Sequence, residues 1–154
     1  MPIMTQPQIQ RAHEEPYAWQ FSVFLPNRVG QLNELLRAMA ENQLELLGIS
    51  VFDSTDWAVA RIVFSEPDKA REILARCKLA FTECQVLLVV LQSARTLGEA
   101  TQVLLAAELN VHFAYPLLAN HEGQPVMVVN VDDHELAIQA LTQHKFKLLG
   151  HEDA

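Results

Sequence analysis

The sequence predicts an α+β fold of two tandem units, each with the ferredoxin-like order β-α-β-β-α-β and an antiparallel sheet with its helices on one face. Three observations predict it. Helical stripes repeat at an offset of 67 to 68 residues, a hairpin lies between the two helices of each half, and extended runs precede and follow them.

The predicted helices of both halves share the apolar spacing i, i+3, i+4, i+7, which is typical of a helix that covers a core. The first helix of each half has Leu32, Leu35, Leu36 and Met39 or Ala100, Val103, Leu104 and Ala107 at these positions. The second has Ala70, Ile73, Leu74 and Cys77 or Ala137, Ala140, Leu141 and His144. We therefore expect the paired stripes to occupy equivalent positions in the two units.

Local signals mark three of the four helix starts. Pro67 suits the first turn of a helix, where its missing N–H costs no hydrogen bond. Thr96 with Glu99, and Asp132 with Glu135, have the spacing of a capping box, in which the first side chain caps the helix. These residues set the expected helix boundaries.

The extended segments are rich in β-branched and apolar residues. Residues 44–52 and 58–64 flank a DSTD turn, and residues 110–118 and 125–131 flank NHEG. An opening strand over residues 17–25 and one strand after each second helix complete the order. The repeat therefore predicts two α+β sandwiches.

The expected domains are residues 17–83 and 84–154, after a flexible arm over residues 1–16. Residues 78–91 contain no glycine, proline or charged spacer, so the last strand of the first unit is expected to run nearly straight into the first strand of the second. We expect the two domains to be rigidly coupled.

Composition excludes several classes of function. Half of the 154 residues are hydrophobic, and the apolar runs are shorter than the ~20 residues of a membrane-spanning helix. The net charge of −8, without a basic cluster, opposes nucleic-acid binding. The N-terminus lacks the apolar core of a secretory signal, which favours the cytoplasm. Cys77 and Cys84 are expected to be reduced thiols.

The sequence offers no catalytic constellation. Its six histidines form no metal-ligand spacing, no serine lies in a Gly-x-Ser-x-Gly elbow, and no glycine-rich phosphate loop occurs among the five glycines. We therefore expect a protein that is not an enzyme and needs neither a metal nor a cofactor.

The segment PNRVGQL, residues 26–32, lies where the opening strand passes to the first helix. Such a junction directs backbone N–H groups and the positive end of the helix dipole at one point, which favours an anion. It is either a binding loop or a plain connector, in which Gly30 makes a turn and Asn27 caps the helix.

Six residues of this segment carry a resemblance to a known family: Asn27, Arg28, Val29, Gly30, Gln31 and Leu32. Together with the double β-α-β-β-α-β order over residues 17–151, they resemble the first loop of tandem ACT domain proteins, small amino-acid-binding modules of which some stand alone without a catalytic domain. The departures are Val29, where proline is frequent, and the second loop SARTLGEA, which keeps Gly98 but has Ala100 at the leucine position.

The resemblance implies an amino acid bound at the interface of two ACT units, with the first loop of one facing the second strand of the other. The six loop residues would bind it, and Asn110 and His112 would come from the facing strand. Backbone N–H groups near Gly30 would hold the carboxylate, and the amide of Asn27 has both a donor and an acceptor. The altered second loop implies one site per chain.

The function expected is therefore a non-catalytic regulatory protein that binds a free amino acid and modulates a partner or its own oligomeric state. The partner would be an enzyme or regulator of amino-acid metabolism, and the chain would form a homo-oligomer, expected to be a dimer, since its sheets have edges to pair. The alternative is a pure interaction or dimerisation module without a ligand.

Overall fold

The computed structural model describes residues 17–26, 30–53 and 56–150; the expected arm, residues 1–16, lies outside them. The strands are β1 (Ala18–Pro26), β2 (Leu46–Asp53), β3 (Trp57–Phe64), β4 (Ala80–Val90), β5 (Val111–Pro116), β6 (Val126–Val131) and β7 (Lys147–Leu149). The helices are α2 (Gln31–Glu41), α3 (Pro67–Arg76), α4 (Arg95–Ala106) and α5 (His134–Gln143).

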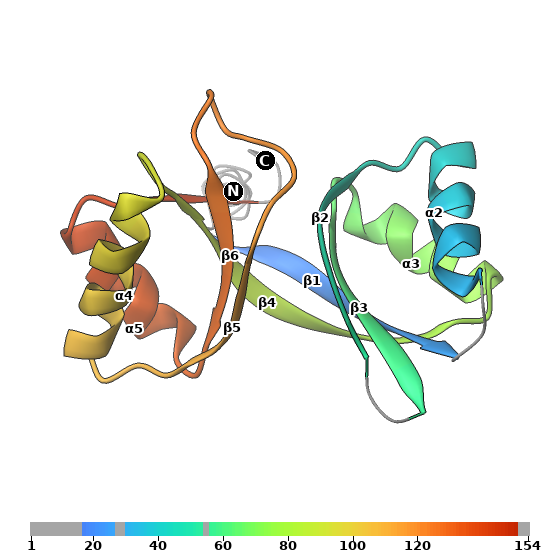
Figure 1. Cartoon of the computed structure of the whole chain (residues 1–154), viewed down its shortest axis with the longest axis horizontal. Helices are drawn as coiled ribbons and strands as arrows, with labels where there is room; N and C mark the ends of the chain where they lie inside the picture. Colours follow the sequence, from blue (N-terminus) through green and yellow to red (C-terminus); the bar gives the residue numbers. More distant parts are fainter. Residues whose placement is uncertain (1–16, 27–29, 54–55, 151–154) are drawn as a thin grey trace, which may run out of the picture.

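Each half of the chain has the predicted order of elements (Figure 1). In the first half the strands are paired in the order β2-β3-β1-β4, which we call sheet 1. In the second half β5, β6, β4 and β7 are paired in that order and form sheet 2. All pairings are antiparallel. The α+β fold with ferredoxin-like halves is therefore confirmed.

Strand β4 belongs to both sheets. Its residues 80–86 pair with β1, and its residues 87–90 pair with β6, with residues 88–90 also pairing with β7 on the other side. The predicted continuity between the last strand of the first half and the first strand of the second is thus present as one uninterrupted strand. The domain boundary between residues 83 and 84 stays a prediction, since β4 changes its partner only after residue 86.

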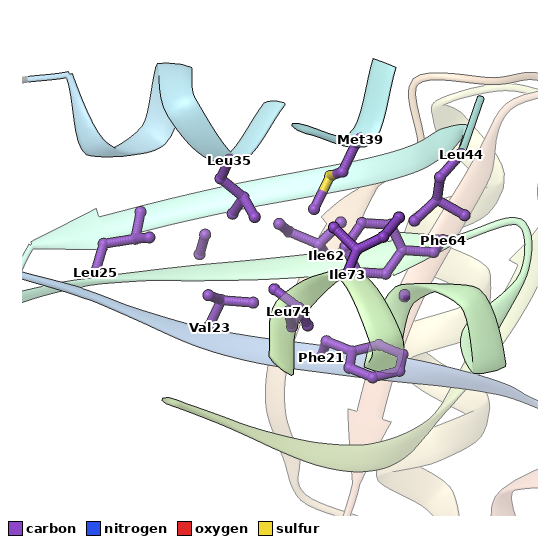
Figure 2. Close-up of a cluster of buried hydrophobic side chains, with 12 residues drawn as sticks. Phe21, Val23, Leu25, Leu35, Met39, Leu44, Ile62, Phe64, Ile73 and Leu74 are labelled. Atoms are coloured by element: carbon purple, nitrogen blue, oxygen red, sulfur yellow. The ribbon is translucent and has the colours of Figure 1, made fainter. Parts of the chain in front are cut away.

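The helices of the first half cover one face of sheet 1. Phe21, Val23 and Leu25 of β1 point to this side with Ile62 and Phe64 of β3, and all are buried. Figure 2 shows these side chains packed beneath Leu35 and Met39 of α2 and Ile73 and Leu74 of α3. Burying each large apolar side chain contributes about 1.5–3 kcal/mol, so this core holds the first half together.

The helices of the second half cover sheet 2 in the same way. Leu87 and Val89 of β4 and Val129 of β6 pack under Leu104 of α4 and Leu141 of α5. The predicted stripes therefore occupy equivalent places in the two halves, with one correction at their ends. Two stripe members, Cys77 and His144, are the C-cap residues of α3 and α5 and are exposed, because each helix ends before it returns to the sheet.

The helix-free faces of the two sheets pack against each other, with the helices on the outside (Figure 1). Sheet 1 contributes residues such as Leu47 and Val63, and sheet 2 contributes residues such as Leu117 and Val128. The two sheets meet closely where the start of β2 reaches the end of β5: the Leu118 N–H donates to the carbonyl of Leu47 over 2.8 Å. This third core joins the halves.

One polar contact is buried in this third core. The hydroxyl of Tyr115 on β5 donates to Oε1 of Gln20 on β1 over 2.7 Å, and Gln20 is fully buried. Its Nε2 donates weakly to Ser22 Oγ and Cys84 Sγ at 3.4 and 3.5 Å. Burial raises the pKa of Tyr115 well above its ordinary value, so its proton stays available for this bond.

Both cysteines are free, as predicted, with Cys77 exposed and Cys84 partly buried. Within residues 17–26, 30–53 and 56–150, no helix is both long and apolar enough to cross a membrane.

Candidate ligand-binding site

The junction between β1 and α2 is built around Gly30. Gly30 is the N-cap of α2 and has φ 88°, a left-handed backbone conformation that glycine adopts without steric cost. Its carbonyl accepts the first helical hydrogen bond, from Glu34 N–H at 2.9 Å. Gly30 itself has no side chain that could cap the first turn of α2. Three predicted site residues, Asn27, Arg28 and Val29, lie outside the described part of the chain.

A cavity of about 400 Å³ opens beside this junction. It is lined by Leu25, Pro26, Gly30, Gln31, Leu32, Asn33, Leu36, Val51 and Ala58. None of these residues is charged, and most are apolar, so the described wall suits an uncharged group. The backbone around Gly30 provides the polar end, next to the positive end of the α2 dipole. The structure therefore brings the predicted residues Gly30, Gln31 and Leu32 together at one cavity.

Sequence reasoning missed the opposite wall of this cavity. Val51 of β2, Ala58 of β3 and Leu36 of α2 line it, and Val51 and Leu36 remain exposed. A signal was present, because Leu36 belongs to the predicted stripe of α2, and Val51 and Ala58 lie on either side of the predicted hairpin turn. Nothing in the spacing of these residues distinguished a cavity wall from a closed core.

The two predicted residues of the second half lie elsewhere. Asn110 and His112 are at the start of β5, are exposed and do not line the cavity. Asn110 donates from its backbone N–H and from Nδ2 to the carboxylate of Asp132, both over 3.2 Å. The strand end nearest to sheet 1 is instead the other end of β5, at Leu117 and Leu118. The structure therefore does not bring Asn110 and His112 to the cavity lined by Gly30, Gln31 and Leu32, and their role in binding stays a prediction.

Asp132 was expected to cap α5, and this expectation is corrected. The N-cap is Asp133, whose side chain accepts from Leu136 N–H at 3.0 Å. Slight desolvation acts to raise the pKa of Asp132, but the hydrogen bonds from Asn110 and the nearby His112 outweigh it and lower that pKa. The carboxylate of Asp132 therefore holds the start of β5 in place.

The corresponding junction of the second half, between β4 and α4, differs. Its N-cap is Ala94, in a right-handed conformation with φ −58°, where the first half has Gly30. Thr96 does not form the predicted capping box with Glu99, because the helix starts before it and its hydroxyl donates to the Ser93 carbonyl over 2.6 Å. A smaller cavity of about 240 Å³ lies here, lined by Val90, Gln92, Thr96, Glu99, Gln124, His144, Lys145, Phe146 and Lys147. Charged side chains replace the apolar wall.

No group of three or more His, Cys, Asp or Glu side chains that could hold a metal ion occurs among the residues described by the structure. Among the polar side chains that come together, Asn110 with Asp132 and Gln20 with Tyr115 are hydrogen-bonded pairs. The geometry at the first junction suits binding of a small molecule with an anionic end and an apolar part.

The fold and cavity define a class: a paired α+β sandwich with a ligand-sized cavity at its first strand-to-helix junction. A family model described as "ACT domain pair" matches residues 17–154, and the chain belongs to this family. No curated protein sequence is significantly similar to it.

Solved structures share the fold. The protein BT0572 of Bacteroides thetaiotaomicron is 24% identical, with 90% of this chain and 95% of that chain covered and a TM-score of 0.82. The regulatory subunit of aspartate kinase from Thermus thermophilus is 15% identical, with 83% and 91% covered and a TM-score of 0.57. The aspartokinase alpha and beta subunits are 15% identical, with 84% and 96% covered and a TM-score of 0.53.

Proposed function

We propose that this chain is a non-catalytic regulatory protein that binds a free amino acid in the cavity between β1 and α2. The observation that carries the proposal is the cavity itself, with a glycine at the helix N-terminus on one side and an apolar wall on the other. Membership of the ACT domain pair family supports it.

The ligand's two ends match the two ends of the cavity. Its carboxylate would face the first turn of α2, where Gly30 leaves the backbone accessible. Its side chain would contact Leu25, Leu36 and Val51, so the wall favours an apolar amino acid over a charged one. The neighbouring loop residues Asn27, Arg28 and Val29, predicted from the sequence, would close the polar end. A contact from Asn110 or His112 would need a second copy of the chain.

The regulatory role would be exerted through another molecule. The likeness to the regulatory subunit of aspartate kinase supports a role in which amino-acid binding modulates an enzyme or regulator of amino-acid metabolism in the cytoplasm, or the oligomeric state of the chain, with a homodimer as the form expected. The altered second junction, at Ala94, limits the proposal to one site per chain.

Calorimetric titration with each of the twenty amino acids tests the proposal. We expect at least one apolar amino acid to bind, and Gly30→Val to abolish binding by filling the space at the helix N-terminus. Gly123→Val is the matched control, because Gly123 also has a positive φ, of 79°, and open space around it, but lies in the β5–β6 connection. Equal loss of binding in both variants would contradict the site.

The alternative function is a pure interaction module. The observation that favours it is the second junction, which lacks the glycine and the apolar wall of the first. If none of the twenty amino acids binds and the chain still dimerises in light scattering, the alternative holds and the cavity beside Gly30 is a packing feature.

A further inference from the structure

The helix-free face of sheet 1 is organised in rows of side chains that run across its strands. Residues opposite each other in an antiparallel pair point to the same face, about 4.5–5.5 Å apart. The strand register defines three successive rows on this face. They are Gly48, Val63, Gln20 and Cys84, then Ser50, Arg61, Ser22 and Thr82, then Phe52, Val59, Phe24 and Ala80.

Sheet 2 covers these rows unequally. The first row is closed, because Tyr115 bonds to Gln20 and Leu117 packs against Gly48. The second row lies at the margin, and Arg61 and its two serine neighbours are partly buried. The third row is more open: Val59 is buried, but Phe52 is 39% exposed and the adjacent Trp57 is 47% exposed. Figure 1 agrees with this difference, since the last residues of β1 and the first residues of β3 extend away from sheet 2.

Arg61 lacks a charge partner in the described part of the chain. Its guanidinium lies 4.5 Å from the centre of the Phe52 ring and 4.0 Å from that of Phe113, which belongs to sheet 2. No hydrogen bond or ion pair to it occurs within residues 17–26, 30–53 and 56–150, and its row contains only the hydroxyl residues Ser50, Ser22 and Thr82. The rings hold the guanidinium in place, and no described residue occupies its N–H groups, which can donate to an anion.

The third row, next to the row of Arg61, lines an apolar cavity. A cavity of about 360 Å³ is lined by Phe24, Trp57, Val59 and Ala80. Val59 is two residues from Arg61 on the same strand, so the two side chains are about 6.6–6.8 Å apart along the sheet. None of the three rows contains an aspartate or glutamate that would pair with an ammonium group.

We propose that this face binds a small organic monocarboxylate with an apolar or aromatic tail and no amino group. Arg61 binds the carboxylate, Ser22 and Ser50 flank it, and the tail fills the cavity at Trp57 and Phe24. This site is separate from the amino-acid cavity at Gly30, because it lies on the opposite face of sheet 1. A ligand bound to Arg61 would also link the two halves of the chain, because Arg61 of sheet 1 contacts Phe113 of sheet 2.

Calorimetry with 3-phenylpropionate on the whole chain tests the proposal. We expect saturable binding at one site, weakened at least tenfold by Arg61→Gln and by Trp57→Ala. Arg95→Gln is the matched control for lost charge, because Arg95 is exposed at the start of α4, and it should leave the affinity unchanged. Two smaller probes test the two ends of the ligand separately. 3-Phenylpropanol lacks the anion and acetate lacks the tail, and each should bind at least tenfold more weakly than 3-phenylpropionate.

Other results would overturn the proposal. Unchanged affinity in Arg61→Gln, or loss of affinity in Gly30→Val instead, would place the probe elsewhere. Absence of binding together with a change in oligomeric state in Trp57→Ala would assign this face to a second copy of the chain.

If Arg61→Gln fails to fold, Arg61→Lys is the second variant, because lysine keeps the charge but not the planar fork of the guanidinium. Arg61→Lys should still weaken binding, and full affinity in this variant would count against the site. Amino-acid binding at Gly30 should persist in Arg61→Gln, so the proposal for each site can be contradicted without contradicting the other.

Discussion

The two faces of sheet 1 are packed by different means. On the helix-covered face, the buried residues of β1 and β3 are all apolar, and Phe21 and Phe64 meet edge to face with ring centres 5.4 Å apart. On the face toward sheet 2, the buried contacts include the hydrogen bond from Tyr115 to Gln20. Apolar packing is tolerant of direction, whereas a buried hydrogen bond is not. The first face therefore contributes stability, and the second also fixes how the sheets are placed.

The largest expected effect is on the helix-covered face. Phe64→Ala should lower the free energy of unfolding by about 3–5 kcal/mol, because it leaves a cavity in a fully buried site. Urea unfolding followed by circular dichroism measures this loss. Phe52→Ala makes the same change on the other face, where the ring is exposed and contacts Arg61, and should cost only about 0.5–1 kcal/mol. If both variants lost a similar free energy of unfolding, the two faces of sheet 1 would not differ in packing as described.

The buried hydrogen bond gives the next effect. Tyr115→Phe should cost about 1–3 kcal/mol, because the carbonyl oxygen of Gln20 is left without its short bond in a dry site. Adding Gln20→Leu should then cost less than the sum of the two single changes, as expected for groups in contact. Strict additivity in this cycle would show that the bond does not couple the sheets.

The close approach of the two sheets at Gly48 should give a smaller effect. A Cβ at this position would lie 2.5 Å from Cδ2 of Leu117, the end of a buried side chain, which must move to make room. Gly48→Ala should therefore cost about 1 kcal/mol, the lower end for overpacking. Gly98→Ala is the control, because Gly98 is in α4 with open space around it, and alanine should stabilise that helix by about 0.5–1 kcal/mol. A stabilising Gly48→Ala would mean that the sheets separate easily here.

A further effect appears only at high pH. The folded-state pKa of Tyr115 is raised by burial above the unfolded value of about 10, so its contribution is fully present below pH 10 and is lost as the pH rises toward the folded pKa. The loss should be at most about 1.4 kcal/mol per pH unit above pH 10. Urea unfolding at pH 9 and pH 11 measures it, and Tyr115→Phe should flatten this part of the profile. An equally steep profile in that variant would assign the effect to other groups.

The repeat in the sequence was enough to predict the fold of each half. The stripes that include Leu35 and Leu104 predicted which helix faces are buried, because a 3.6-residue period directly reports a covered face. The lack of a spacer around residues 78–91 predicted continuity between the halves, and β4 provides it. Helix ends were less predictable: Asp133, not Asp132, is the cap, since a carboxylate at either position can accept from the first turn of the helix.

The sequence predicted the position of the first cavity but not its surroundings. Gly30 marked the junction because few other residues adopt its backbone conformation. The expected approach of Asn110 and His112 depended on how the two halves are placed, and that placement is set by side chains such as Gln20 and Tyr115 on the helix-free faces. Alternation along a strand does not show whether a polar residue such as Gln20 faces water or a second sheet.

The shared strand β4 also determines what kind of movement the chain can make. Within the described residues, the chain crosses from one half to the other inside β4, which is hydrogen-bonded to β1 over residues 80–86 and to β6 over residues 87–90, and also to β7 over residues 88–90. Hinge motions use loop or element-terminal residues, and the crossing contains neither. We therefore expect the two sheets to rotate together as one rigid unit. Any signal that this chain transmits must be read as movement relative to another molecule, not as opening between its own halves.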